Sequence, residues 1–304
     1  MNLSDATQPW TAAIFPGNRT TAWLSASKLS GTGPGQIVLT ASGAGFAPGA
    51  YRATVVIQSP NATPQYINVP VIFVLDGSTS GTSIGGVASA ATAQLTGSPG
   101  MLLSVYGTKL ANSVRTASGI PLPYSIDGVS AVVNGVAAPL VYISQDQINL
   151  QVPYEVGAGP AVLGINNNGQ IAGFAFQVTP TTPGIFADPN GNLVPNATVK
   201  QGGTTTLYMT GAGEVSPLIL TGTTASSTTP LSSLPKPQLP LAVTVAGIPA
   251  FLQYVGISSG LVGTVQVNFT VPASVPAGVQ PLVVTVGGVP SPAVNLTVQP
   301  ASSQ

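Results

Sequence analysis

The chain reads AVVNGVAA at residues 131–138 and VTVAGIPA at residues 243–250, and a tyrosine follows each stretch four residues later. Further along, QINLQVP at residues 147–153 is echoed by QVNFTVP at residues 266–272. Self-similarity of this kind is the sequence signature of a structural unit that occurs more than once. The second and larger part of the chain is therefore predicted to hold two homologous domains.

The repeats set the predicted domain boundaries. We place the two copies at about residues 86–180 and 181–304. Residues 1–76 do not share the repeated pattern and are expected to form a smaller domain of their own. The Gly-, Ser- and Thr-rich residues 77–85 are predicted to be a flexible linker.

Short apolar runs make up each of these parts. Examples are QIVLT at residues 36–40, RATVVI at 52–57 and LAVTV at 241–245, and the 36 glycines and 29 prolines of the chain lie between such runs. Short β-prone runs with turn residues between them are typical of sandwiches and barrels. No long stretch has the 3.6-residue period of a helix. We predict an all-β fold of three tandem immunoglobulin-like β-sandwiches with minimal helix.

The composition excludes several classes of function. Seven Lys and Arg and seven Asp and Glu make up only 5% of the 304 residues, against roughly 25% in an average domain. The scattered cations form no basic patch, so a nucleic-acid partner is not expected. The chain has no cysteine and no histidine, which removes thiol chemistry, the commonest general base and the commonest metal ligand. We predict a protein that is not an enzyme and has no cofactor.

Neither a membrane-spanning segment nor a targeting segment is visible in the sequence. No apolar run reaches the roughly 18 residues that a transmembrane helix needs. Residues 1–5 show neither the basic start nor the apolar stretch of a signal peptide. We expect an extracellular or cell-surface protein whose signal peptide is absent from this chain.

Three stretches near the N-terminus resemble the BACON-type domain: WLSAS at residues 23–27, SGTGP at 30–34 and APGAYRATV at 47–55. That family is an immunoglobulin-like module often attached to secreted carbohydrate-active proteins. Such a domain normally has a further strand before the one at residues 10–13. Either residues 2–7 supply a short strand or the domain has an open edge, and an open edge presents unpaired N–H and C=O groups to another chain.

The remainder of the chain resembles the repeated C-terminal domain of large secreted acidobacterial proteins. The resemblance is carried by VSAVVNGVAAPL at residues 129–140, QINLQVP at 147–153, TPGIF at 182–186 and VTVGGV at 284–289. It implies a β-sandwich fold and secretion. It implies no activity.

Asp127, Asp146 and Glu155 form the densest group of acids. A catalytic pair of carboxylates is the alternative to solvated loop acids. We favour loop acids, because the second repeat has Ser274 in the place of Glu155 and because Asp127-Gly128 is typical of a hairpin turn.

Residues 188–192, DPNGN, have oxygen-bearing side chains at alternate positions, as a calcium loop does. The bidentate acid that such loops use further along is missing. A turn is the preferred interpretation, and no metal site is predicted.

Two kinds of surface site are predicted. Exposed aromatic rings can stack on sugars, and Trp10 and Tyr66 are the candidate stacking residues, whereas Trp23 is expected in the core. Asn-X-Ser/Thr sequons mark candidate glycosylation sites. They lie at Asn18, Asn61, Asn196, Asn268 and Asn295.

Two functions from different classes fit these features. The first is a structural subunit of an extracellular fibre or filament, assembled by self-association into a homopolymer through strand edges or donated strands. The second is a secreted module that binds polysaccharide and acts in adhesion. The near absence of charge favours the first, because little repulsion keeps copies apart.

Overall fold

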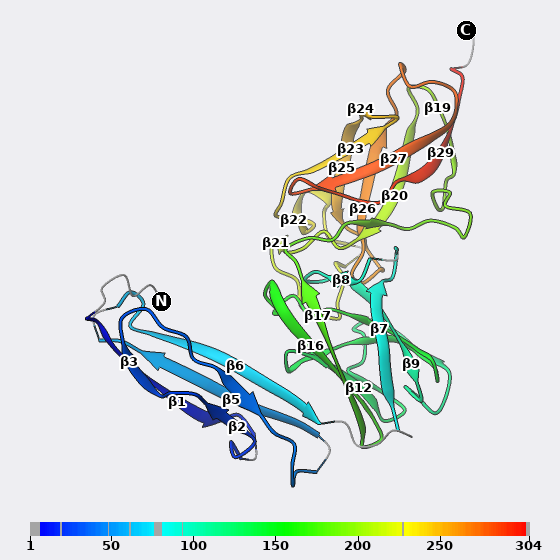
Figure 1. The fold of residues 1–304 in the computed structure, drawn as a ribbon. Helices are drawn as coiled ribbons and strands as arrows, with labels where there is room; N and C mark the ends of the chain where they lie inside the picture. The colour runs from blue at the N-terminus through cyan, green and yellow to red at the C-terminus, as the bar shows by residue number, and fades with distance from the viewer. Residues whose placement is uncertain are drawn as a thin grey trace. The chain divides into compact units, whose positions relative to one another are not determined.

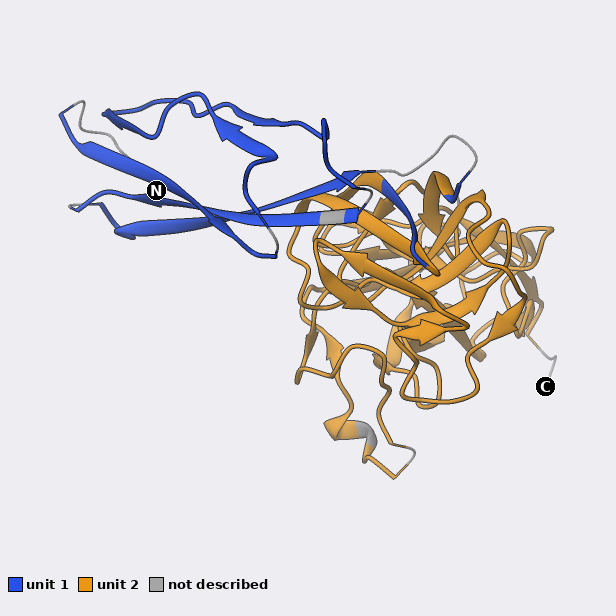
Figure 2. Cartoon of the chain, turned by 90° about the horizontal axis from the view of Figure 1, so that it is seen from below, with its two compact units in different colours: residues 1–82, 169–173 blue, residues 83–168, 174–304 orange. Residues whose placement is uncertain are grey.

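The computed structural model describes residues 7–18, 20–47, 49–60, 62–75, 81–92, 94–226 and 228–301. Its contacts divide the chain into two compact units, residues 1–82 with 169–173 and residues 83–168 with 174–304 (Figure 2). The predicted all-β, multi-domain β-sandwich fold is confirmed in the described parts of both units. The single helical segment among the described residues is one 3₁₀ turn, Leu231–Ser233.

The first unit is a small two-layer sandwich (Figure 1). One sheet has four strands in the order β3-β1-β5-β6, and the second sheet has only β2 and β4. The strands are β1 Pro9–Pro16, β2 Leu24–Ala26, β3 Ser30–Thr32, β4 Leu39–Ala41, β5 Gly49–Gln58 and β6 Tyr66–Leu75.

Strand alternation builds the core of this unit, because successive side chains of a strand point to opposite faces of its sheet. On β5, Tyr51, Ala53 and Val55 point inward and are buried. Trp23, with 1% of its surface exposed, is stacked on Phe73 of β6, with ring centroids 5.5 Å apart. The prediction that Trp23 lies in the core is therefore confirmed.

The second unit begins with a sandwich of two sheets, in the orders β10-β14-β15-β9-β7 and β11-β12-β16-β17-β8, with β13 paired to β12. Its aliphatic core includes Leu103, Leu140, Ile148 and Leu163. The strands are β7 Ser83–Ser89, β8 Thr96–Gly97, β9 Leu102–Thr108, β10 Arg115–Thr116, β11 Ser125–Ile126, β12 Val129–Val133, β13 Val136–Ala138, β14 Leu140–Ile143, β15 Gln147–Gln151, β16 Gly159–Asn167 and β17 Gln170–Val178.

A second sandwich completes this unit, with sheets in the orders β18-β20-β26-β25 and β19-β29-β27-β23-β24, β28 paired to β27, and a small β21-β22 pair. Leu207, Phe269 and Val284 lie in its separate core. The strands are β18 Gly184–Ile185, β19 Thr198–Lys200, β20 Thr204–Thr210, β21 Val215–Ser216, β22 Lys236–Pro237, β23 Leu241–Val245, β24 Ile248–Pro249, β25 Phe251–Ile257, β26 Val265–Thr270, β27 Gly278–Val286, β28 Val289–Pro290 and β29 Val294–Gln299.

The stretches that repeat in the sequence repeat in the structure. Residues 131–138 form the β12-β13 hairpin and residues 243–250 form the β23-β24 hairpin. Both hairpins turn through two residues of positive φ, at 134–135 and 246–247, as a tight two-residue hairpin requires. The next strand has an irregularity in the same place in each copy, just before Tyr142 and just before Tyr254.

The predicted linker is wrong at its C-terminal end. Strand β7 begins at Ser83, and Ser83 and Ile84 pair with Thr108 and Gly107 of β9 instead of forming a flexible connection. Residues 76–80 lie outside the described residues. The predicted boundary at residue 181 falls inside the second unit and stays a prediction.

Candidate functional site

A shallow hollow of about 360 Å³ lies where β1, β5 and the β5-β6 turn meet in the first unit. Tyr66, 60% exposed, stands on its rim. The hollow is lined by Pro9, Trp10, Thr11, Gln58, Ser59, Pro60, Gln65 and Tyr66.

Strand register places three of these side chains in one row. Thr11 pairs with Gln58, and Gln58 pairs with Tyr66. Residues directly opposite each other across neighbouring strands point to the same face of the sheet. A phenol ring, an amide and a hydroxyl therefore stand side by side on the outer face. Within the described part of the chain, the side chains of Thr11 and Gln58 make no hydrogen bond.

Three hydrogen bonds hold the rim of the hollow in place. The hydroxyl of Ser59 donates to the Pro9 carbonyl at 2.9 Å and accepts from Gln8 Nε2 at 3.0 Å. Gln65 Nε2 donates to the Pro60 carbonyl at 2.9 Å. These bonds tie the β5-β6 turn to the start of β1, so the surface around Tyr66 is preorganised.

Trp10 corrects one of the predictions. Its ring was expected on the surface, but only 4% of Trp10 is exposed. The indole N–H donates to the Gly33 carbonyl at 3.2 Å, and the Lys28 ammonium lies 5.4 Å from the ring centroid. The ring packs against β3, where a Cβ at Gly31 would collide with it. The Trp10 ring is therefore buried on the inner face of the sheet, whereas Tyr66 is exposed as predicted.

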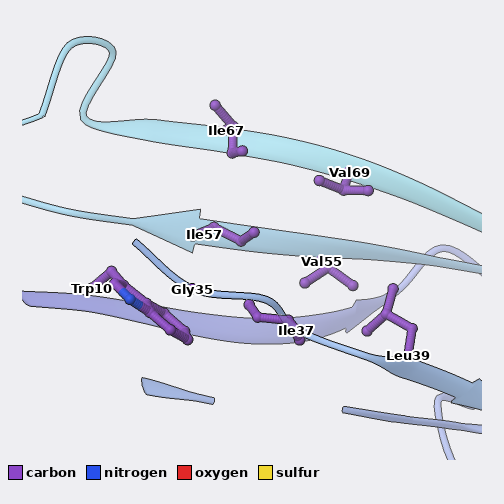
Figure 3. A pocket seen from close by; sticks show the side chains of 8 residues that line it. All are labelled: Trp10, Gly35, Ile37, Leu39, Val55, Ile57, Ile67 and Val69. Atoms are coloured by element: carbon purple, nitrogen blue, oxygen red, sulfur yellow. The ribbon is translucent and has the colours of Figure 1, made fainter. Parts of the chain in front are cut away.

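A second hollow, an apolar groove of about 330 Å³, lies on the inner face of the same sheet (Figure 3). It separates the β4 segment of the small sheet from β5 and β6. Six of its eight lining residues are aliphatic. They are Ile37, Leu39, Val55, Ile57, Ile67 and Val69, with Trp10 and Gly35 at one end.

The three candidate acids each contact a different partner. Asp127, at φ +47° in the predicted hairpin turn, pairs with Arg115 at 3.1 Å. Asp146 accepts from the Ser144 hydroxyl at 2.7 Å. Glu155 accepts from the Thr221 hydroxyl at 2.8 Å. Each acid thus has a structural partner of its own.

The predicted turn at residues 188–192 is confirmed. Asp188 Oδ1 accepts from the backbone N–H groups of Asn190 and Asn192, both at 2.8 Å. The hydrogen bonds from Asn192 hold the pKa of the Asp188 carboxyl below its usual value. No group of three or more acids that could hold a metal ion occurs among the described residues.

The candidate glycosylation sites differ in exposure. Asn196 is exposed in the loop before β19, whereas Asn18, Asn268 and Asn295 are half-buried. Asn18 Oδ1 accepts from the Arg52 N–H at 2.7 Å, and Asn268 Oδ1 accepts from Thr206. Asn61 lies outside the described residues. Glycosylation stays a prediction at all five positions.

Sequence reasoning missed a buried polar network inside the second unit. Gln151, fully buried, donates from Nε2 to the Gly100 carbonyl at 3.1 Å and accepts at Oε1 from the Gly222 N–H at 2.7 Å. The Thr221 hydroxyl accepts from the Tyr154 N–H at 3.1 Å. These bonds join the segment at residues 221–222 of the second repeat to the first repeat.

No family model and no curated protein matches the chain. The resemblance to BACON-type and acidobacterial domains therefore stays a prediction. No helix in the described residues is long and apolar enough to cross a membrane.

Several solved structures are similar in fold. The SGBP-B protein of a mixed-linkage glucan utilization locus of Bacteroides ovatus, solved with a mixed-linkage heptasaccharide, is 11% identical, with 96% of this chain and 61% of that chain covered and a TM-score of 0.35. SGBP-B from a xyloglucan utilization locus of Bacteroides uniformis is 16% identical, with 71% and 49% covered and a TM-score of 0.24. The I9–I11 tandem of titin is 9% identical, with 97% and 90% covered and a TM-score of 0.21.

The chain spans less than two thirds of the length of either SGBP-B chain. At these TM-scores the likenesses carry no argument about what this chain binds.

Proposed function

We propose that this is an extracellular, non-catalytic protein that binds a neutral polysaccharide at the hollow beside Tyr66. The observation that carries the proposal is the row of Thr11, Gln58 and Tyr66 on the outer face of the first unit. Location outside the cell rests on the resemblance to secreted families.

Two kinds of contact are available to a sugar in this row. The exposed phenol ring of Tyr66 offers an apolar face against which the C–H face of a pyranose can pack, because an aromatic ring combines an apolar body with a polar tip. The amide of Gln58 and the hydroxyl of Thr11 can both donate and accept hydrogen bonds with sugar hydroxyls. Among the described residues, no carboxylate or cation lines the hollow, so its chemistry suits a neutral chain.

Affinity electrophoresis in gels that contain mixed-linkage glucan, xyloglucan or xylan tests the proposal. An aromatic platform worth about 0.5–1.5 kcal/mol corresponds to roughly a twofold to tenfold change in Kd. We expect Tyr66→Ala to lose retardation by that factor. The matched control is Phe251→Ala, which removes a ring that is 73% exposed in the second unit. Equal retardation of the Tyr66→Ala and wild-type proteins on every retarding gel, or no retardation on any gel, contradicts the proposal.

A second function, self-association through strand edges, is favoured by the apolar groove of Figure 3. Its aliphatic lining is poorly suited to sugar hydroxyls and well suited to apolar side chains. We propose that copies of the chain associate at this groove. Sedimentation velocity over a wide range of concentration tests the idea, and a protein that stays monomeric throughout contradicts it.

A further inference from the structure

A second exposed tyrosine stands beside a hollow in the first sandwich of the second unit. The hollow has a volume of about 520 Å³ and follows strand β7, which lines it with Gly86, Ala88 and Ala90. Tyr106 of β9, 48% exposed, and Leu95, 72% exposed, belong to the same lining. The remaining lining residues are Val87, Ser89, Ala91 and Thr92.

Strand register explains why this space is open. Gly86 is opposite Tyr106, and Ala88 is opposite Ser104, so these residues share the outer face of the sheet. From Gly86 to Ala90, no β7 side chain on this face is larger than a methyl group. The Tyr106 ring therefore has no large neighbour on β7.

The second repeat closes the equivalent space. Tyr208 of β20 is the counterpart of Tyr106, because each is opposite the glutamine that opens the repeated QINLQVP or QVNFTVP stretch. Beside Tyr208 lies Phe186, whose N–H donates to the Tyr208 carbonyl at 2.9 Å. A phenylalanine thus takes the place in which the first repeat has Gly86.

Hydrogen-bonding groups border the hollow. The Val87 side chain is only 2% exposed, so Val87 lines the hollow with its backbone. The Ala90 N–H donates to the Leu102 carbonyl, and bonded positions alternate in an antiparallel pair. The N–H and C=O of Val87 therefore point away from β9. Within the described residues, the Tyr106 hydroxyl and Gln147 Oε1 make no hydrogen bond.

The edge of β7 is too interrupted to accept a peptide strand. Strand addition uses the outward backbone groups of alternate residues, which here are Gly85, Val87 and Ser89. Gly85 lies in the bulge of β7, and the Ser89 N–H already donates to the Gln94 carbonyl at 2.8 Å. Bulges are also a common guard against edge pairing. The hollow therefore favours a ligand that needs no ladder of backbone hydrogen bonds.

We propose that the hollow beside Tyr106 is a second binding site for neutral polysaccharide, separate from the row beside Tyr66. We take the class of ligand from the proposed function, on which this inference rests. The Tyr106 ring supplies an apolar platform for a sugar ring. The Val87 backbone and the Gln147 amide supply donors and acceptors for sugar hydroxyls. No charged side chain is among the described residues that line the hollow, which matches an uncharged ligand.

The length of the hollow selects a polymer segment. Between Gly86 and Ala90 it follows four residue steps of β7, which is roughly 13 Å at ~3.3 Å each. That length exceeds a single pyranose ring. The site therefore takes a short stretch of a polysaccharide chain, and a monosaccharide should compete for it poorly.

Affinity electrophoresis of variants that already carry Tyr66→Ala isolates this site. The gels contain mixed-linkage glucan, xyloglucan or xylan, as for the first site. Adding Tyr106→Ala should weaken the residual retardation by a further twofold to tenfold in Kd, the effect of losing one aromatic platform. The matched control adds Tyr208→Ala, which removes the counterpart ring of the second repeat, and should leave the residual retardation unchanged.

Filling the hollow tests the same site while the tyrosine remains. Gly86→Phe copies the arrangement of Phe186, and a Cβ at Gly86 meets nothing within 4 Å. We expect Gly86→Phe to weaken the residual retardation at least as much as Tyr106→Ala does. Gly86→Ala, which adds only a methyl group, should keep most of it. Thermal unfolding of each variant shows that lost retardation is not lost folding.

The outcomes separate this site from the one beside Tyr66. Residual retardation that is unchanged by Tyr106→Ala, or equally reduced by Tyr208→Ala, overturns the second site. A Tyr66→Ala protein that is not retarded at all overturns it too and leaves the first site standing. If Tyr66→Ala matches the wild type and Tyr106→Ala does not, the first site is refuted and the second stands. A wild-type protein that no gel retards refutes both.

Discussion

Replacing Gln151 with leucine should weaken the second unit far more than replacing its counterpart in the other repeat. The Gln151 amide is fully buried and joins the Gly100 carbonyl to the Gly222 N–H. Leucine has nearly the same volume but cannot make either bond. Thr270 occupies the equivalent place in β26, where its hydroxyl accepts from Gln253 at the surface. Thr270→Val is therefore the matched control.

The magnitude follows from the groups that are left without a partner. A buried polar group without a hydrogen bond costs about 1–3 kcal/mol, and Gln151→Leu strands two, since Gly100 and Gly222 are both buried. The apolar side chain recovers about 1.5–3 kcal/mol of transfer free energy. The midpoints of these ranges, about 4 and about 2 kcal/mol, leave a net loss of roughly 2 kcal/mol. The surface hydrogen bond that Thr270→Val removes contributes about 0.5 kcal/mol or less.

Thermal unfolding measured by calorimetry on the full chain decides the matter. For a unit of 150–250 residues, each kcal/mol lowers Tm by roughly 2–4 °C. We expect Gln151→Leu to lower the transition of the second unit clearly and Thr270→Val to leave it nearly unchanged. If the two variants melt together, the bridge between the repeats contributes nothing to stability and the reasoning is refuted.

Two further predictions concern β9 and the turn at Asp188. Gly107→Ala would push a Cβ into the Ser83 carbonyl oxygen, whereas a Cβ at Gly86 meets nothing within 4 Å. Urea unfolding should therefore show that Gly107→Ala lowers the free energy of unfolding by about 1–3 kcal/mol and that Gly86→Ala does not. Equal losses in the two variants would contradict this prediction. The pKa of Asp188 is lower in the folded state than in the unfolded state, so its ionised carboxylate stabilises the fold when the pH is above the unfolded pKa of about 3.9. This contribution is lost as the pH falls through the folded pKa. The stability deficit of Asp188→Asn should therefore be full at neutral pH and shrink in acid, and a deficit independent of pH would contradict this.

Much of the fold can be predicted from local sequence patterns. The Asp127-Gly128 turn was predictable because its two residues are ones that accept positive φ, and they adopt +47° and +79°. The two copies were visible because their hairpins need the same turn in the same place. Trp23 was predictable as core from its position in the motif at residues 23–27.

The interactions that sequence reasoning missed are those between distant segments. The sequence predicts Trp10 on the surface because nothing adjacent to it shows what covers it. The Trp10 ring is covered by β3 and the loop after it. The sequence feature that could have predicted this is the series of glycines at 31, 33 and 35, which leaves room for a large ring against the backbone. The bond between Thr221 and Glu155 gave no local signal, since its partners are 66 residues apart.

The two proposed functions use opposite faces of one sheet, and strand alternation keeps them separate. Tyr66 and Gln58 point outward, whereas their neighbours Ile67 and Ile57 point into the groove. Association of copies at the groove therefore leaves the row beside Tyr66 exposed. A single shallow site that depends on one ring binds weakly, but linked sites can exceed the affinity of one site by about 10²–10⁴ when their spacing matches the polymer. Head-to-tail assembly, which repeats one contact without closing a ring, would supply such an array, so self-association and polysaccharide binding reinforce each other instead of competing as alternatives.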